Sequence, residues 1–184
     1  MNACSKTNVS ERQFKKGAYI MPPKPKFTKE MLIQTAIELA KEGGLEAIVA
    51  RNLGAKLDTA PSTIFTHFNS VEEIRQAVIA EARVLYNRYV EEGLRMVPPM
   101  KGFAVQYIRF AMEEPMLYSV LFMKKREDFK YVDFIVAEGH YEKIITAAET
   151  DFSLNREQAE FVYHNMWAYA HGLAVMSATG VCKF

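Results

Sequence analysis

Apolar residues recur at helical spacing through most of this chain, and this periodicity constrains its fold more than any other feature. The clearest stretch follows Phe27 and contains Met31, Leu32, Ala36, Ile37, Leu39 and Ala40. No segment shows the convincing apolar–polar alternation of a half-buried strand. Nine Gly and seven Pro in 184 residues are few, which favours long regular elements. The sequence therefore predicts an all-α fold of about eight helices.

Capping and stop signals divide this pattern into separate helices. Thr28 is the predicted N-cap of the first helix, and Gly43 and Gly44 are its predicted end. Ser70 and Glu73 match a capping box at the start of a long helix, and residues 151–153 are a predicted break. Asn155 or Ser153 is the predicted N-cap of the last helix. The predicted helices cover residues 29–42, 51–57, 61–68, 71–96, 103–112, 115–123, 131–149 and 155–178.

Two of these helices are very short and are separated only by Asp58-Thr59-Ala60. Two short helices joined by a tight turn and braced by a preceding helix form a helix-turn-helix, whose second helix enters the DNA major groove. Ile64 and Phe68 are four residues apart and fit its buried face. The other faces then carry polar groups that can contact phosphates or base edges, namely Ser62, Thr63, Thr66 and His67.

The charge of the chain is distributed unevenly. Residues 1–29 carry seven Lys or Arg and one acidic residue, a net charge of +6, so the remainder carries −5 of the overall +1. A basic arm of this kind suits an anionic partner such as DNA, and Lys24 and Lys26 are the contacts expected from it. A solvated tail, or a leader that precedes Met21, are the alternatives for the arm.

The stretch from Met31 to Ile79 resembles the DNA-binding head of the tetracycline-repressor (TetR) family. The matching features are Gly44 before Leu45, Arg51, Leu53, the run APSTIFTHF and the pair Glu72-Glu73. Near the C-terminus, Trp167 followed by His171-Gly172 resembles the body of one TetR subgroup. The resemblance implies three parts, a basic arm (1–26), a helix-turn-helix DNA-binding domain (27–70) and a helical ligand-binding and dimerisation domain (71–184).

The resemblance also implies a function. Such a protein is a transcriptional repressor that binds a palindromic operator as a homodimer and is released by a small apolar or aromatic effector. The DNA contacts expected in the head are Arg51, Ala60, Pro61, Ser62, Thr63, Phe65, Thr66 and His67. The residues expected to line the effector pocket are Tyr107, Phe110, Met123, Tyr141, Met166 and Trp167.

Several positions depart from the family pattern. The usual turn glycine is Asp58, which tolerates left-handed backbone better than most residues. Phe65 replaces a tyrosine, Val71 replaces a lysine, and Val49 replaces the threonine that caps the second helix. Because these changes remove phosphate contacts, a second hypothesis is kept: a helical protein-interaction module with weak or lost DNA binding.

Other function classes find little support. The sequence contains no Gly-rich phosphate loop, nucleophile elbow or HExxH motif, so an enzyme is not expected. Glu160, His164 and His171 have helical spacing suitable for a metal, but packing explains them better and nothing completes a site. We therefore predict neither a metal nor a cofactor. No apolar run approaches the ~18 residues of a membrane span and no secretory signal is evident, so a cytoplasmic location is expected.

Overall fold

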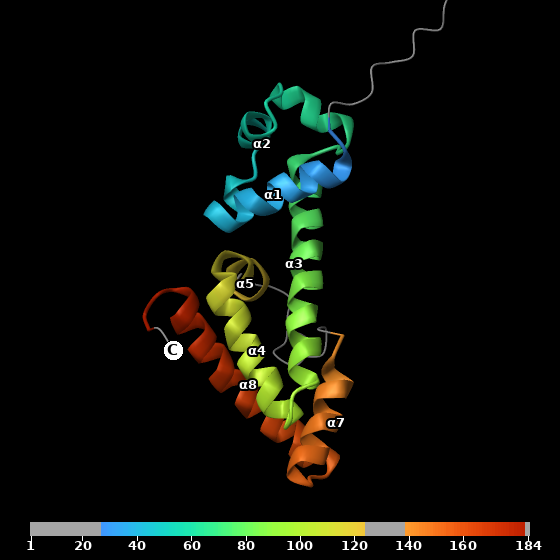
Figure 1. Ribbon diagram of the computed structural model, residues 1–184, viewed down its shortest axis with the longest axis vertical. Coiled ribbons are helices and arrows are strands. Elements are labelled where there is room, and N and C mark those ends of the chain that lie inside the picture. Colours follow the sequence, from blue (N-terminus) through green and yellow to red (C-terminus); the bar gives the residue numbers. More distant parts are fainter. Residues whose placement is uncertain (1–26, 124–138, 183–184) are drawn as a thin grey trace, which may run out of the picture.

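The computed structural model describes residues 27–123 and 139–182, and its regular structure in those ranges is helical throughout (Figure 1). The predicted all-α class is confirmed. None of the described helices combines the length and the apolar composition that crossing a bilayer requires. The elements are α1 (Lys29–Gly43), the 3-10 helix η1 (Leu45–Ala47), α2 (Ala50–Lys56), the 3-10 helix η2 (Pro61–Thr66), α3 (Val71–Leu94), α4 (Pro99–Glu113), α5 (Pro115–Phe122), α7 (Tyr141–Phe152) and α8 (Arg156–Ala178).

The long helix α3 connects two groups of helices (Figure 1). The elements α1, η1, α2 and η2 lie around its first turns, and we call this group the head. The helices α4, α5, α7 and α8 lie along and beyond the rest of α3, and we call this group the body. The head and the body also meet directly, because α1 packs against α5.

The first helix begins and ends where the sequence predicts. The side chain of Thr28 accepts a hydrogen bond from the backbone N–H of Met31 (3.2 Å). Gly44 has a φ of 70°, a conformation that favours glycine and ends α1. Between these ends α1 buries one apolar face, which comprises Leu32, Ala36, Leu39 and Ala40.

The long helix α3 carries a partly altered version of its predicted capping box. Ser70 is the N-cap and accepts from the backbone N–H of Glu73 (3.1 Å), as predicted. The carboxylate of Glu73 accepts from the backbone N–H of Asn69 (2.8 Å), whereas a capping box has it return to the cap residue itself. The start of α3 therefore keeps two capping hydrogen bonds, and the backbone N–H of Asn69 is the donor in the second.

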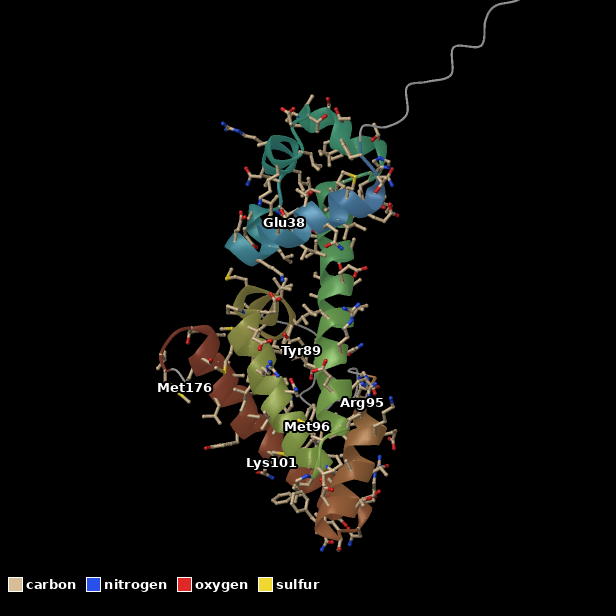
Figure 2. The ribbon with its side chains drawn as sticks, in the orientation of Figure 1. Glu38, Tyr89, Arg95, Met96, Lys101 and Met176 are labelled. Atoms are coloured by element: carbon tan, nitrogen blue, oxygen red, sulfur yellow. The ribbon has the colours of Figure 1, made fainter. Side chains whose placement is uncertain are left out.

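The packing of α3 against α4 depends on a close approach of their backbones. A Cβ atom placed on Gly93 of α3 would lie only 2.7 Å from the carbonyl oxygen of Gly102 of α4, which leaves no room for a side chain. One turn earlier in α3, Tyr89 faces α4 (Figure 2), and its hydroxyl donates to the Glu113 carboxylate (2.6 Å). The ring of Tyr89 packs on Phe110. Together these contacts fix α4 alongside α3.

The predicted break at residues 151–153 is wrong in its first two positions. Helix α7 continues through Phe152 and ends at Ser153, which has a left-handed φ of 53°. Asp151 stays helical, and its carboxylate accepts from the backbone N–H of Met100 (2.8 Å) in the first turn of α4. The carboxylate of Asp151 therefore satisfies a free N–H group of another helix.

The predicted helix over residues 131–149 also differs from the structure. Residues 131–138 lie outside the described ranges. Helix α7 begins at Tyr141, and it is preceded by Gly139, which has a φ of 71°, and by the non-helical residue His140. A positive φ at this glycine ends any helical path through it. Of the two predicted N-caps of the last helix, α8, the structure has Asn155, and Gln158 completes a reciprocal capping box.

Candidate nucleic-acid interface

The turn between α2 and η2 is tight because two residues allow it. Asp58 has a φ of 47°, so the left-handed conformation expected in place of the usual glycine is confirmed. Gly54 of α2 lets the turn lie directly on the helix, since a Cβ there would come within 2.8 Å of the carbonyl oxygen of Thr59. The backbone N–H of Thr59 in turn donates to the carbonyl of Gly54 (2.9 Å). The geometry is that of a helix-turn-helix.

The second helix of the motif is shorter and more tightly wound than predicted. Residues 61–68 are expected to form one helix, but Pro61–Thr66 form the 3-10 helix η2, which has three residues per turn. Residues three apart therefore share a face. Ile64 is fully buried, as predicted, and anchors the inner face. Phe68 is also buried as predicted, although it lies beyond the end of η2.

The 3-10 winding sorts the expected DNA-contact residues into two outward rows. Ser62 and Phe65 form one row, and both are exposed. The half-buried Thr63 and the exposed Thr66 form the other row, in which the hydroxyl of Thr66 donates to the backbone carbonyl of Thr63 (2.8 Å). That hydroxyl therefore offers mainly its acceptor side outward. Ala60 precedes η2 with extended backbone, and its carbonyl accepts from the N–H of Thr63 (2.9 Å).

His67 lies at the end of η2 and already has a partner inside the head. Its Nε2 atom is 2.9 Å from the backbone carbonyl oxygen of Phe27, and its ring packs against the ring of Phe27. This histidine therefore ties the segment before α1 to the end of η2. A phosphate contact by His67 stays a prediction, and it would have to use the ring's other nitrogen.

Arg51 and Lys56 are the two cations of α2 and they differ in availability. Lys56 pairs with Glu42 (2.8 Å) and Glu38 (3.5 Å) of α1, and the Glu42 hydrogen bond raises the pKa of this ammonium. Arg51 is exposed in the first turn, and no ion pair joins it to another described residue. The N-cap before it, Val49, makes no side-chain hydrogen bond. Arg51 is thus the cation of α2 available to an anion.

One residue that holds the interface in place is missing from the sequence-based set. Arg75 of α3 donates from Nε to the carbonyl of Leu45 (3.1 Å) and from a terminal nitrogen to the carbonyl of Ile48 (3.3 Å). It thereby fixes the segment that leads into α2. Its spacing of four residues from Val71 and three from Val78 places Arg75 beside the apolar face of α3, but no local pattern points to its distant carbonyl acceptors. Lys24 and Lys26, the expected arm contacts, lie outside the described residues.

The residues expected to bind an effector do not form one group in the structure. Tyr107, Phe110 and Trp167 are buried in the aromatic core of the body. Tyr141 begins α7 and lies between Tyr163 and Arg156. The remaining two are Met123, which follows α5 and is exposed, and Met166, which is half-buried.

A polar cluster lies inside that aromatic core. The hydroxyls of Tyr107 and Tyr118 are 2.9 and 2.8 Å from Nδ1 of His171, and the indole of Trp167 stacks on the imidazole at 4.9 Å. Burial lowers the pKa of His171. The neutral imidazole is therefore favoured, and the Trp–His-Gly motif of the sequence forms part of the core.

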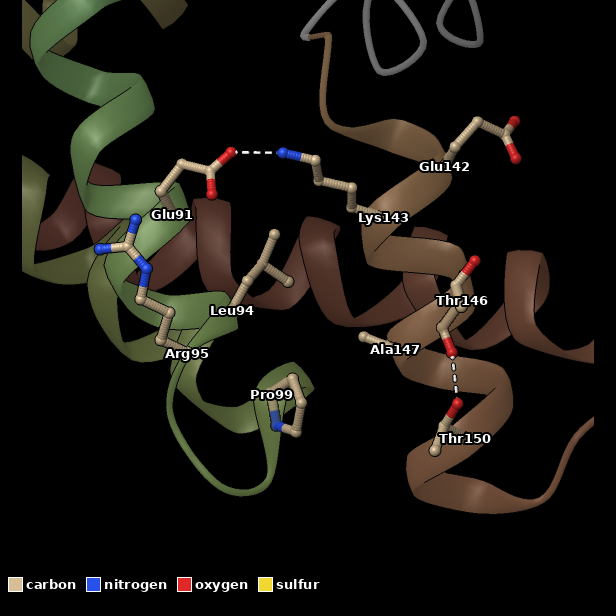
Figure 3. Close-up of a pocket in the computed structure, with 9 residues that line it drawn as sticks. All are labelled: Glu91, Leu94, Arg95, Pro99, Glu142, Lys143, Thr146, Ala147 and Thr150. Carbon is tan, nitrogen blue, oxygen red and sulfur yellow. Dashed lines mark hydrogen bonds and ion pairs between the residues drawn. The ribbon is translucent and has the colours of Figure 1, made fainter.

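The body also carries a cleft on its outer surface, between the end of α3 and α7. Its volume is about 580 Å³. Figure 3 shows Leu94 and Pro99 on one side and Ala147 of α7 on the other. Glu91 and Lys143 bridge the two sides with an ion pair of 2.5 Å (Figure 3). None of the six expected effector-binding residues lines this cleft.

Comparisons with known proteins agree with the motif. The chain is 23% identical over 160 residues to the uncharacterized HTH-type transcriptional regulator Rv0681 of Mycobacterium tuberculosis, covering 85% of this chain and 72% of the relative. It is 23% identical over 107 residues to the uncharacterized HTH-type transcriptional regulator YobS of Bacillus subtilis, covering 56% of each chain. No model of a protein family and no solved structure matches. The chain is therefore a distant relative of HTH-type transcriptional regulators.

Proposed function

We propose that this protein is a transcriptional repressor of the TetR type, whose head binds double-stranded DNA. The observation that carries the proposal is the η2 segment, which is anchored by buried Ile64 and turns two rows of side chains outward. The two relatives are named HTH-type transcriptional regulators, which is consistent with a DNA-binding head. The proposed division of the chain is the arm (1–26), the DNA-binding domain (27–70) and the effector and dimerisation domain (71–184).

The proposed DNA contacts divide by chemistry. Arg51 neutralises a phosphate, and the hydroxyls of Ser62 and Thr63 donate to phosphates or base edges. The remaining proposed contacts are Ala60, Pro61, Phe65, Thr66 and His67 of the motif, together with Lys24 and Lys26 of the arm. Contacts to phosphate set the affinity and its salt dependence, and contacts to base edges set the sequence preference.

A homodimer is part of the proposal, because helix-turn-helix proteins usually bind palindromic sites as two-fold dimers. The support is an outward apolar face on α8, where Phe161 and Tyr169 are 70% and 71% exposed. Ala168 lies on the same face, as does Gly172, around which a Cβ would meet open space. A face of large apolar and small residues on a long helix suits close packing against a second copy.

The dimer is tested by sedimentation. Replacing Phe161 and Tyr169 together with Lys should convert a sedimenting dimer into a monomer. Val97→Lys is the matched control, since Val97 is 95% exposed but lies in the α3–α4 connection, and it should leave the dimer intact. An unchanged dimer in the double variant would place the dimer interface elsewhere.

Release by an apolar or aromatic effector completes the proposal. The body offers polar groups inside apolar surroundings, as small-molecule sites do. His171 with its tyrosine partners is one such group, and the side-chain oxygen of Gln106, buried with no hydrogen-bond partner among the described residues, is another. Such an effector binds the arrangement of the body that does not fit the operator more tightly than the arrangement that does. The difference between these two binding free energies, typically ~1–3 kcal/mol, is the amount by which DNA binding weakens.

The function is tested with DNA selected from the genome of the source organism. Fragments retained by the full chain should contain a palindrome, and fluorescence anisotropy should show binding that weakens as salt increases. Ser62→Ala with Thr63→Ala should weaken it while the melting temperature stays unchanged. If no fragment is retained, the chain is not a DNA-binding repressor, and the protein-interaction module becomes the better hypothesis.

A further inference from the structure

The most exposed large apolar side chain of the motif belongs to Phe65. Phe65 is 46% exposed, whereas Ile64 beside it is fully buried. No ring contact or cation contact joins Phe65 to another described residue. The ring therefore keeps a large part of its apolar surface in water, which forgoes the stabilisation that burial would bring.

The position of this ring is set by the backbone of η2. The 3-10 winding places Phe65 three residues after Ser62, so that both side chains lie on one outward row. The start of η2 rests on Gly54, where a Cβ would come within 3.2 Å of the Pro61 nitrogen. Because the inner row is anchored by Ile64, the segment has little freedom to turn the ring inward.

The chemistry of the ring limits what it can contact on DNA. A phenyl ring has no donor or acceptor for a phosphate oxygen or a polar base edge. In the major groove the apolar group presented by the bases is the C5-methyl of thymine. We propose that Phe65 is a specificity-determining residue that packs against a thymine methyl, beside the hydroxyl contacts of Ser62 and Thr63. This inference rests on the proposed DNA-binding function.

Replacing thymine by deoxyuracil in a selected operator tests the contact, because that change removes one methyl group and leaves base pairing intact. Each thymine of one half-site is replaced in turn, together with its symmetry mate. One position should lose about fourfold in affinity per half-site, which corresponds to about 0.8 kcal/mol for one buried carbon. The other positions should change little.

Variants of Phe65 connect the methyl to the ring. Phe65→Ala should bind the thymine and deoxyuracil operators equally well, and Phe65→Tyr should keep the discrimination. Val84→Ala is the matched control, because Val84 is similarly exposed (47%) but lies on α3 away from η2, and it should also keep the discrimination. Circular dichroism checks that all three variants are folded.

The outcomes separate this inference from the function on which it rests. Wild-type protein that binds the operator but shows no sensitive thymine overturns the role of Phe65 alone. A sensitive thymine whose effect persists in Phe65→Ala also overturns it and assigns the methyl contact to another side chain. A chain that binds no selected duplex overturns the proposed function and this inference together.

Discussion

Lys41 at the end of α1 and Glu114 at the start of α5 form an ion pair of 2.6 Å, which joins the head directly to the body. The glutamate side chain is the less exposed partner, at 18% against 42% for the lysine. Nearby, a Cβ on Gly44 would lie 3.4 Å from the terminal methyl of Met116, so the backbone after α1 also lies close to α5. The head is thus linked to the body at a second place besides α3.

Removing this ion pair should have a small effect on stability. Lys41→Met and Glu114→Gln should each lower the free energy of unfolding by no more than about 1 kcal/mol, because partly exposed pairs contribute little. In a double-mutant cycle measured by urea unfolding, the coupling should shrink when the salt concentration is raised to 1 M. A coupling that high salt leaves unchanged would show that packing, and not charge, joins the two residues.

Gly54→Ala should disrupt the helix-turn-helix although alanine is the better helix former. The added Cβ meets backbone atoms of Thr59 and Pro61, so the turn has to move away from α2. We expect a loss of about 1–3 kcal/mol in unfolding free energy and a loss of operator binding. Ala55→Gly, an exposed position of the same helix, is the control and should cost at most about 1 kcal/mol with binding retained. Equal binding by both variants would contradict the prediction.

Arg51→Ala should alter the salt dependence of operator binding more clearly than it alters the fold. One lost phosphate contact lowers the slope of log affinity against log salt by about 0.9 per half-site. Anisotropy titrations at several salt concentrations measure this slope. Lys101→Ala, at an exposed position of α4 in the body, should leave it unchanged, and an unchanged slope for Arg51→Ala would remove this residue from the phosphate contacts.

The stability of the body should fall as the pH falls below the ordinary His pKa of about 6.5. Burial lowers the pKa of His171 in the folded state, so the unfolded state binds the proton more readily below that pH and unfolding becomes easier. The contribution of neutral His171 to the unfolding free energy is therefore complete above pH 6.5. It decreases as the pH falls from 6.5 toward the lower pKa of His171 in the folded state. His171→Gln should show a smaller drop in melting temperature between pH 7.5 and 5.0 than the wild type, whereas equal drops would contradict the prediction.

Signals that act over a few residues are the ones that the sequence conveys well. The caps at Thr28 and Asn155 and the left-handed turn at Asp58 depend on local backbone chemistry, and all three are confirmed. The periodic burial of Ile64 and Phe68 is confirmed for the same reason. These local signals predict the all-α class, and together with the resemblance to the TetR head they predict the helix-turn-helix.

Features that depend on distant partners were not predictable in the same way. Arg75 binds carbonyl groups about thirty residues earlier in the chain, and Asp151 binds the first turn of α4. The close approach of α3 and α4 at Gly93 and Gly102 gives no periodic pattern in the sequence, because two backbones meet there and no row of side chains does. The 3-10 winding of η2 changes which side chains share a face, and this decides how Phe65 and Ser62 are arranged.

The contact between Gly93 and Gly102 has a consequence for movement. Because the two backbones lie this close, a side chain added at either glycine would push α3 away from α4 at this point. Gly93 lies near the end of α3, so the first residue of that helix, Val71, is about 33 Å away at 1.5 Å per residue. By this geometry a tilt of about 5° at the glycines shifts the start of α3 by about 3 Å. In the proposed dimer, a substitution at Gly93 or Gly102 would therefore change the spacing of the two heads, although it lies far from the proposed DNA contacts.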